Sequence, residues 1–198
     1  MKKIIVFNRI TLDGFFAGTN GEIDWFVQDP ELDQKMMFDK KVGQPDTILF
    51  GRKTYEMFEG YWPKVEAGAS DLEFSPQGEE ALREERKIAA LLTKMNKIVF
   101  SRKPRQVYWE NSRVMNNNLI EEVQRIKKGD GNGIIIFGSG SLVQQLTNQD
   151  LIDEYLLILT PVVLGKGKPL FNNVERSSFR LNGVETYKTG NVLLHYKR

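Results

Sequence analysis

The chain has 198 residues, of which 40% are hydrophobic and 27% charged, so one substantial domain with a large core is possible. Its 28 basic and 26 acidic side chains leave a net charge of +2, too balanced to indicate a nucleic-acid-binding protein. The lack of cysteine excludes disulfides, thiolate catalysis and cysteine-based metal sites, and a single histidine, His195, excludes a multi-histidine metal centre.

The first apolar run, Ile4–Phe7, ends at Asn8 and Arg9. It is too short for a signal peptide core and far too short to span a bilayer, so we expect a cytoplasmic protein with no membrane partner. Its β-branched and aromatic residues predict a first strand that is buried on both faces.

Glycine and proline divide the next part of the chain. Three glycines within residues 11–21 predict a long loop. Pro30 begins a predicted helix of about three turns that reaches Val42. A buried strand is predicted at 47–50. A short helix is predicted to follow it as far as Phe58, and Pro63 is expected to end this helical stretch.

The second half alternates apolar runs with amphipathic stretches. We expect an insertion at about 64–95 that ends in a helix over 79–95. The other predicted elements are strands at 97–100, 107–109, 134–137 and 154–159, helices at 118–128 and 140–146, and a closing antiparallel pair within 179–196.

This order predicts an α/β domain over residues 1–198, with a mostly parallel central sheet and helices on both faces. The final pair adds antiparallel edge strands at the C-terminus. Ligands of such sheets bind beyond the carboxyl ends of the strands.

Three predicted strand ends carry residues suited to anions. Residues 51–54 (Gly-Arg-Lys-Thr) combine a helix N-terminus with a guanidinium and a hydroxyl. Ser101 and Arg102 suit a phosphate monoester. Residues 138–141 (Gly-Ser-Gly-Ser) form a glycine-rich turn into a helix, although the third glycine of a Rossmann motif is missing. Alone, the first and third motifs also fit an ordinary strand-to-helix turn, and the second also fits a strand that ends in polar residues.

Together, the three ends match the anionic groups of a dinucleotide with an additional phosphate. We therefore predict NADPH as the cofactor, in preference to NADH, because Arg52 and Arg102 would otherwise lack an evident partner.

Five motifs resemble the dihydrofolate reductase family, in the expected order. The closest resemblance is to the reductase domain of bacterial riboflavin-biosynthesis enzymes. The motifs lie at 11–14, 51–56, 98–102, 135–140 and 153–171.

The resemblance implies a dihydrofolate reductase-like fold and an NADPH-dependent reduction of a small heterocycle, such as a pterin-like or ribosylaminopyrimidine-like molecule. It also implies a homodimer. The implied cofactor residues are Phe16, Ala17, Gly18, Gly51, Arg52, Thr54, Ser101, Arg102, Phe137, Gly138, Ser139, Gly140, Ser141 and Leu142.

Candidates for the proton donor are Asp24 and Glu154, although each also fits a structural carboxylate. Trp25, Phe26 and Trp62 are predicted to line the substrate pocket, or else to belong to the core. No metal site is expected.

A catalytically silent protein that retains the cofactor cleft remains an alternative, since no carboxylate aligns clearly with the family's pteridine-binding acid. The nearest basic cluster, at 102–105, is short, interrupted by proline and already explained by a phosphate, so no nucleic-acid partner is expected.

Overall fold

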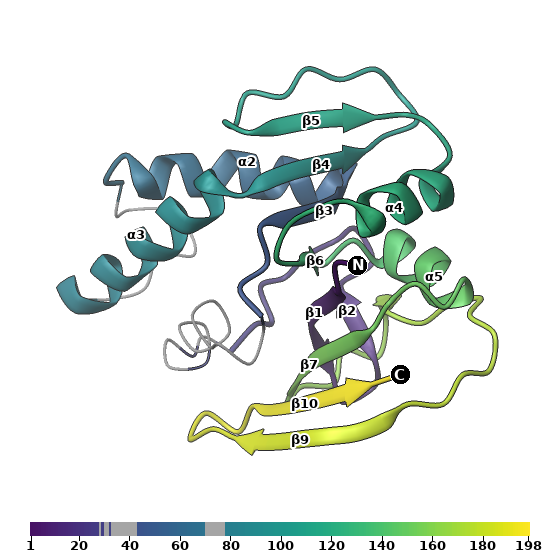
Figure 1. Cartoon of the computed structure of the whole chain (residues 1–198). Helices are drawn as coiled ribbons and strands as arrows, with labels where there is room; N and C mark the ends of the chain where they lie inside the picture. Colours follow the sequence, from purple (N-terminus) through teal and green to yellow (C-terminus); the bar gives the residue numbers. More distant parts are fainter. Residues whose placement is uncertain (28, 30–31, 33–42, 70–77) are drawn as a thin grey trace.

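The computed structural model describes residues 1–27, 29, 32, 43–69 and 78–198 (Figure 1). Its strands are β1 (Ile4–Thr11), β2 (Phe15–Ala17), β3 (Thr47–Gly51), β4 (Asn96–Phe100), β5 (Ser112–Met115), β6 (Ile134–Phe137), β7 (Glu154–Thr160), β8 (Lys168–Pro169), β9 (Arg180–Thr186) and β10 (Val192–Lys197). Its helices are α2 (Arg52–Glu66), α3 (Glu79–Lys94), α4 (Leu119–Lys128) and α5 (Gly140–Asn148).

The central sheet has 8 strands in the order β5-β4-β3-β6-β1-β7-β10-β9. All neighbours from β5 to β7 are parallel, and β10 pairs antiparallel with both β7 and β9. The predicted parallel sheet with an antiparallel C-terminal edge is therefore confirmed. Because the parallel strands are in register, the ends of β3, β4 and β6 lie together at one edge of the sheet.

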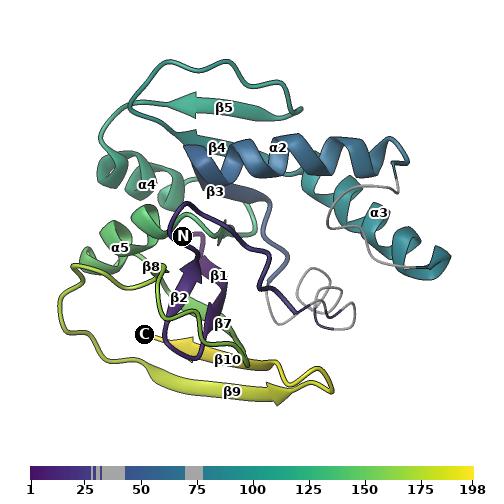
Figure 2. The ribbon, with the colours of Figure 1, turned by 180° about the vertical axis from the view of Figure 1, so that it is seen from behind.

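Helices cover both faces of the sheet, with α4 and α5 on one face and α2 and α3 on the other (Figures 1 and 2). Successive residues of the buried strands point to opposite faces, so each strand contributes to two cores. Ile135 and Phe137 pack on the side of α2, whereas Ile134 and Ile136 pack on the side of α5. This double burial explains why the central strands are apolar without alternation.

Two predicted elements differ from the structure. Residues 107–109 are not a strand, and the strand of this region, β5, follows at Ser112–Met115. The helix after β3 does not end before Pro63 but continues to Glu66, because Pro63 lies in its last turn, where buried Val65 anchors it. The helix predicted from Pro30 to Val42 lies outside the described residues, apart from Leu32.

The C-terminal end of α3 is held by a buried lysine. The Lys97 ammonium donates to the carbonyls of Leu92, Thr93 and Met95 at 2.8, 2.9 and 2.8 Å. It also lies 4.4 Å from the ring centroid of Trp109. These contacts satisfy carbonyl groups that a helix end leaves without partners.

The loop predicted at 11–21 contains β2, which pairs antiparallel with β8. Asp13 holds this pair of strands together, because its carboxylate accepts from Thr11 Oγ1 at 2.5 Å and from the main-chain N–H of Gly165, shortly before β8, at 2.8 Å. None of the helices that the structure describes combines the length and apolar character needed to cross a membrane.

Candidate functional site

A pocket of about 850 Å³ lies at the carboxyl edge of the parallel strands. It is built by the ends of β3, β4 and β6, the starts of α2 and α5, and parts of β1 and β2. Every predicted cofactor residue except Gly18 lines it. Those residues are Phe16, Ala17, Gly51, Arg52, Thr54, Ser101, Arg102, Phe137, Gly138, Ser139, Gly140, Ser141 and Leu142.

The charged side chains that line the pocket are all positive. Among the described residues, no aspartate or glutamate belongs to the lining. The cations are Arg9, Arg52, Lys53, Arg102, Lys103 and Lys168. A concave surface with charge of one sign concentrates ligands of the opposite sign, so the pocket suits an anionic ligand.

Two helices begin at the pocket with open N-termini. Neither Gly51, before α2, nor Ser139, before α5, caps its helix with a side-chain hydrogen bond, and neither helix has an acidic residue in its first turn. By contrast, α4 is capped by Asn118 and has two glutamates in its first turn. The free N–H groups and positive dipole ends of α2 and α5 can therefore serve an anion.

The two helix starts are braced against each other by reciprocal hydrogen bonds. Gly51 N–H donates to Ser139 Oγ at 2.9 Å, and Ser139 N–H donates to Thr54 Oγ1 at 3.0 Å. Asn8 Nδ2 adds a bond to the Gly138 carbonyl at 3.1 Å. The hydroxyl oxygens of Thr54 and Ser139 thus accept main-chain N–H groups within the turn, and each hydroxyl keeps its own O–H hydrogen for a further acceptor such as an anion.

Residues 138–140 combine an unusual backbone conformation with a close contact to a neighbouring aromatic ring. Gly138 and Ser139 have φ values of 52° and 50°, in the left-handed region. A Cβ atom added to Gly140 would lie 2.5 Å from Cζ of Phe16. The aromatic ring of β2 therefore packs directly on the start of α5, and glycine at 140 permits this close approach.

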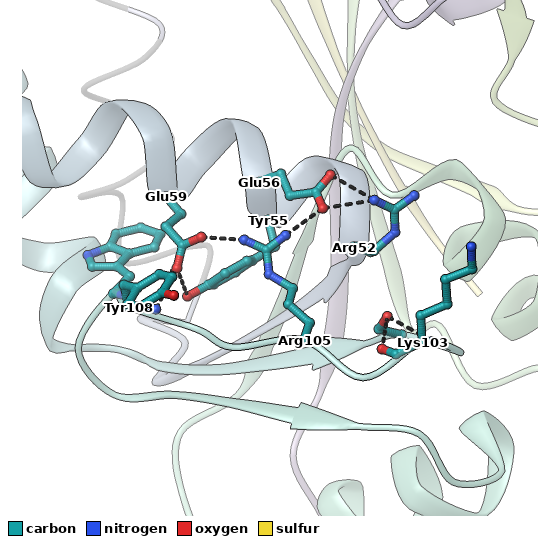
Figure 3. Close-up of polar contacts among 9 residues, drawn as sticks. Arg52, Tyr55, Glu56, Glu59, Lys103, Arg105 and Tyr108 are labelled. Atoms are coloured by element: carbon teal, nitrogen blue, oxygen red, sulfur yellow. Dashed lines mark hydrogen bonds and ion pairs between the residues drawn. The ribbon is translucent and has the colours of Figure 1, made fainter.

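A chain of ion pairs runs along α2 and holds the loop after β4 (Figure 3). Arg52 Nη1 lies 2.8 Å from Glu56 Oε1, which in turn lies 2.6 Å from Arg105 Nη1. Arg105 also pairs with Glu59, whose Oε1 accepts from the Tyr55 hydroxyl at 2.9 Å. Arg105 and Glu59 were not among the predicted site residues, and 46 positions separate them in the sequence.

Burial opposes ionisation of Glu59, but hydrogen bonds from Tyr108 N–H, Tyr55 and Trp109 N–H outweigh it, together with the nearby Arg105 charge. They hold the pKa of this carboxyl below its usual value, so Glu59 is a fixed anion that anchors the loop. The same loop carries Arg102 and Lys103 to the pocket.

Ser101 is buried at the end of β4, and its hydroxyl donates to the Lys103 carbonyl at 2.8 Å. The hydroxyl also accepts from Lys103 N–H at 3.3 Å. It therefore shapes the turn after β4, beside exposed Arg102.

The structure does not bring either predicted proton donor to the pocket. Asp24 is exposed and does not line it. Glu154 begins β7 and so lies at the opposite edge of the sheet, since only the ends of parallel strands reach the pocket edge. Its carboxylate is buried and pairs with Lys3 Nζ at 2.8 Å and His195 Nε2 at 2.6 Å.

Of the predicted substrate residues, only Phe26 lines the pocket. Trp25 packs edge-on against Phe26, with ring centroids 4.6 Å apart, and Trp62 packs against Phe58 at 6.1 Å. Gly18 lies in a turn outside the lining, where its N–H donates to the Glu22 carbonyl at 2.9 Å.

Sequence reasoning missed the contribution of β1, which places Phe7, Asn8 and Arg9 in the lining. Asn8 and Arg9 are both buried. The signal was present, because two polar residues interrupt an otherwise apolar strand, and buried polar side chains in a central strand need a partner or a ligand.

Comparison with known proteins agrees with this architecture. The family model described as the RibD C-terminal domain matches residues 2–193. The chain is 36% identical, over 197 residues, to the uncharacterized protein YyaP of Bacillus subtilis (strain 168), covering 98% of this chain and 94% of that protein.

Two solved structures are similar in fold. A putative riboflavin biosynthesis protein from Shewanella sp. PV-4 gives a TM-score of 0.68 at 22% identity, covering 100% of this chain and 99% of the other. Dihydrofolate reductase from Enterococcus faecalis, complexed with NADP(H), gives 0.62 at 13% identity, covering 99% and 96%. The predicted dihydrofolate reductase-like fold is confirmed, and the chain belongs to the RibD C-terminal domain family.

Proposed function

We propose that this protein is an NADPH-dependent reductase of a small conjugated molecule. The observation that carries the proposal is the pocket at the carboxyl edge of the sheet, where two uncapped helix N-termini meet a lining whose described charges are all positive. Membership of a reductase-like family and the fold shared with dihydrofolate reductase support it.

The residues present fit a phosphorylated dinucleotide. The N–H groups at the start of α5 would hold the pyrophosphate, beside the ring of Phe16 that packs on Gly140. Arg52, after β3, and Arg102, after β4, would bind the additional phosphate of NADPH. The ion pairs of Arg105 with Glu56 and Glu59 connect the loop after β4 to α2 and so hold these two segments together. Phe16 and Ala17 would border the nicotinamide.

When bound, the cofactor would supply a hydride. The chain would contribute orientation and exclusion of water, which hydride transfer mainly requires. Phe7, Phe26 and Phe137 supply an apolar wall for a flat acceptor. Neither Asp24 nor Glu154 enters the proposal, because neither lines the pocket. Solvent water can donate the proton that completes the reduction of the substrate.

Calorimetric titration of the purified protein with NADPH and with NADH tests the cofactor. We expect NADPH to bind at least tenfold more tightly, as charge-assisted bonds to one more phosphate imply. No binding of either at millimolar concentration would refute the proposal, and equal affinities would refute the roles of Arg52 and Arg102.

A silent binding protein is the second candidate, favoured by the lack of a described carboxylate in the pocket lining. Oxidation of NADPH, followed by its absorbance with a panel of pterin, ribosylaminopyrimidine and quinone acceptors, separates the two. The expected homodimer and cytoplasmic location stay predictions, which light scattering and cell fractionation would test.

A further inference from the structure

The central strand β1 carries an amide side chain beside the glycine-rich turn. Asn8 lines the pocket but is only 4% exposed. Its Nδ2 donates to the main-chain carbonyl of Gly138 at 3.1 Å. Because a carbonyl can only accept, this bond fixes which way the amide is turned and leaves Oδ1 on the side away from that carbonyl.

The oxygen is the unmatched half of this amide. None of the residues that the structure describes donates a hydrogen bond to Asn8 Oδ1. Water can serve this oxygen in the free protein, but a ligand that displaces the water must donate a hydrogen bond in its place or lose affinity. Asn8 therefore selects for a donor group on whatever ligand covers it.

The order of the strands indicates which part of a dinucleotide would reach Asn8. β6, which leads into α5, lies between β3 and β1 in the sheet. A pyrophosphate held at the start of α5 would thus have Arg52 and Arg102, after β3 and β4, on one side and β1 on the other. Since those cations would bind the phosphate of the adenosine half, the nicotinamide half would extend toward β1.

Asn8 also lies on the face of the sheet that α5 covers. Alternate residues of a strand point the same way, and Ile4 and Val6 pack in the core on that face. Phe16, whose ring packs on Gly140 at the start of α5, contacts the same core. Asn8 therefore shares this side of the sheet with an aromatic ring that is proposed to border the nicotinamide.

We infer that Asn8 is a cofactor-binding residue whose Oδ1 accepts a hydrogen bond from the carboxamide N–H of the nicotinamide. The inference rests on the proposed function, because it assigns one contact within the same cofactor site. The carboxamide amino group is the hydrogen-bond donor of the nicotinamide ring, whereas the ionised phosphates offer acceptors alone. The ribose hydroxyls are the other donors of this half, and the experiment separates them from the carboxamide.

The experiment compares NADP⁺ with two analogues that are changed only at the carboxamide. The thionicotinamide analogue keeps the amino group and replaces the carboxamide oxygen by sulfur. The 3-acetylpyridine analogue keeps the oxygen and replaces the amino group by methyl. All of them share the ribose hydroxyls and the phosphates. Calorimetry measures the binding of each to the purified protein, so the result does not depend on turnover.

We expect the wild type to bind NADP⁺ and the thionicotinamide analogue about equally, and each about tenfold more tightly than the acetylpyridine analogue. N8L removes the amide and should abolish this preference. N8D keeps an acceptor oxygen and should retain the preference, while its charge weakens the binding of every phosphate-bearing ligand. N172L, the same change as N8L at an exposed asparagine outside the lining, should behave like the wild type. Circular dichroism verifies that each variant is folded.

Equal binding of NADP⁺ and the acetylpyridine analogue by the wild type would overturn the inference, because the donor would then not be the carboxamide. A preference that survives in folded N8L would overturn it as well. A purely structural role, exerted through the bond to Gly138, would weaken all three ligands equally and leave the preference intact. If none of the three binds at millimolar concentration, it is the proposed function that fails.

Discussion

Replacing Thr54 by valine removes the hydroxyl that accepts the Ser139 N–H at 3.0 Å while preserving the shape of the side chain. Ser139 is only 5% exposed, so its N–H would lose its partner with little access to water. An unsatisfied buried donor costs about 1 to 3 kcal/mol, and partial exposure of Thr54 favours the lower half of that range. We therefore expect T54V to lower the free energy of unfolding by about 1 to 2 kcal/mol.

For a chain of this length, that loss corresponds to a melting temperature lower by about 2 to 8 °C. The variant should also bind NADPH more weakly, because the brace holds the starts of α2 and α5 in place for the anion. Differential scanning calorimetry and cofactor titration measure both effects. T186V, at an exposed threonine of edge strand β9, is the control and should change neither.

A double-mutant cycle sharpens the test. S139A removes the acceptor of the Gly51 N–H, which lies 2.9 Å from Ser139 Oγ in the wild type. Because both bonds hold the same turn, the two changes should be less costly together than the sum of their separate effects. If T54V matched the wild type in stability and cofactor affinity, or if the two changes were strictly additive, the reciprocal brace would not hold the site together.

Three further changes have distinct signatures. R52Q should reduce NADPH affinity about tenfold and leave NADH affinity unchanged in titrations, unless Arg52 serves only its ion pair with Glu56. K97M leaves three main-chain carbonyls at the end of α3 without their donor, so it should lower the free energy of unfolding by about 2 to 4 kcal/mol. Urea denaturation measures this change, and an unchanged midpoint of the unfolding transition would contradict it. Burial raises the pKa of Glu154, but bonds from Lys3 and His195 outweigh it, so the folded pKa lies below the usual 4.5. Its stabilising contribution is thus present above pH 4.5 and lost as the pH falls through the folded pKa, so E154Q should flatten the acid limb of a stability–pH curve.

The central strands could be predicted because burial on both faces favours continuous apolar runs, as in Ile134–Phe137. The error at 107–109 has a physical cause. These residues have strand-forming side chains, but the N–H groups of Tyr108 and Trp109 donate to the Glu59 carboxylate at 2.7 and 3.3 Å. A side chain from α2 thus takes the place of a neighbouring strand, and local propensity cannot reveal such a partner.

The anion-suited turns of the site could also be predicted, because glycine and the start of a helix are local features. Roles within them could not. The hydroxyl of Thr54, predicted as a phosphate ligand, also accepts the N–H of Ser139, 85 positions away, and no local pattern indicates this second partner. In the sequence, Arg9 marks the end of an apolar run, and only the folded sheet places it in the pocket lining.

The ion pairs along α2 explain how the pocket keeps its positive lining close to two glutamates. Glu56 and Glu59 bond to Arg105 and, through Glu56, to Arg52, and neither glutamate belongs to the lining (Figure 3). Because Arg52 and Glu56 are partly exposed, their pair contributes little to stability, so its main effect is on geometry. The carboxylates hold the Arg52 guanidinium and the loop after β4 from outside the lining, and the open helix ends and the cations remain in the pocket wall. Under the proposed function, the glutamates would position the site and the cations and helix ends would bind the anion, which is the arrangement that a rigid anion site requires.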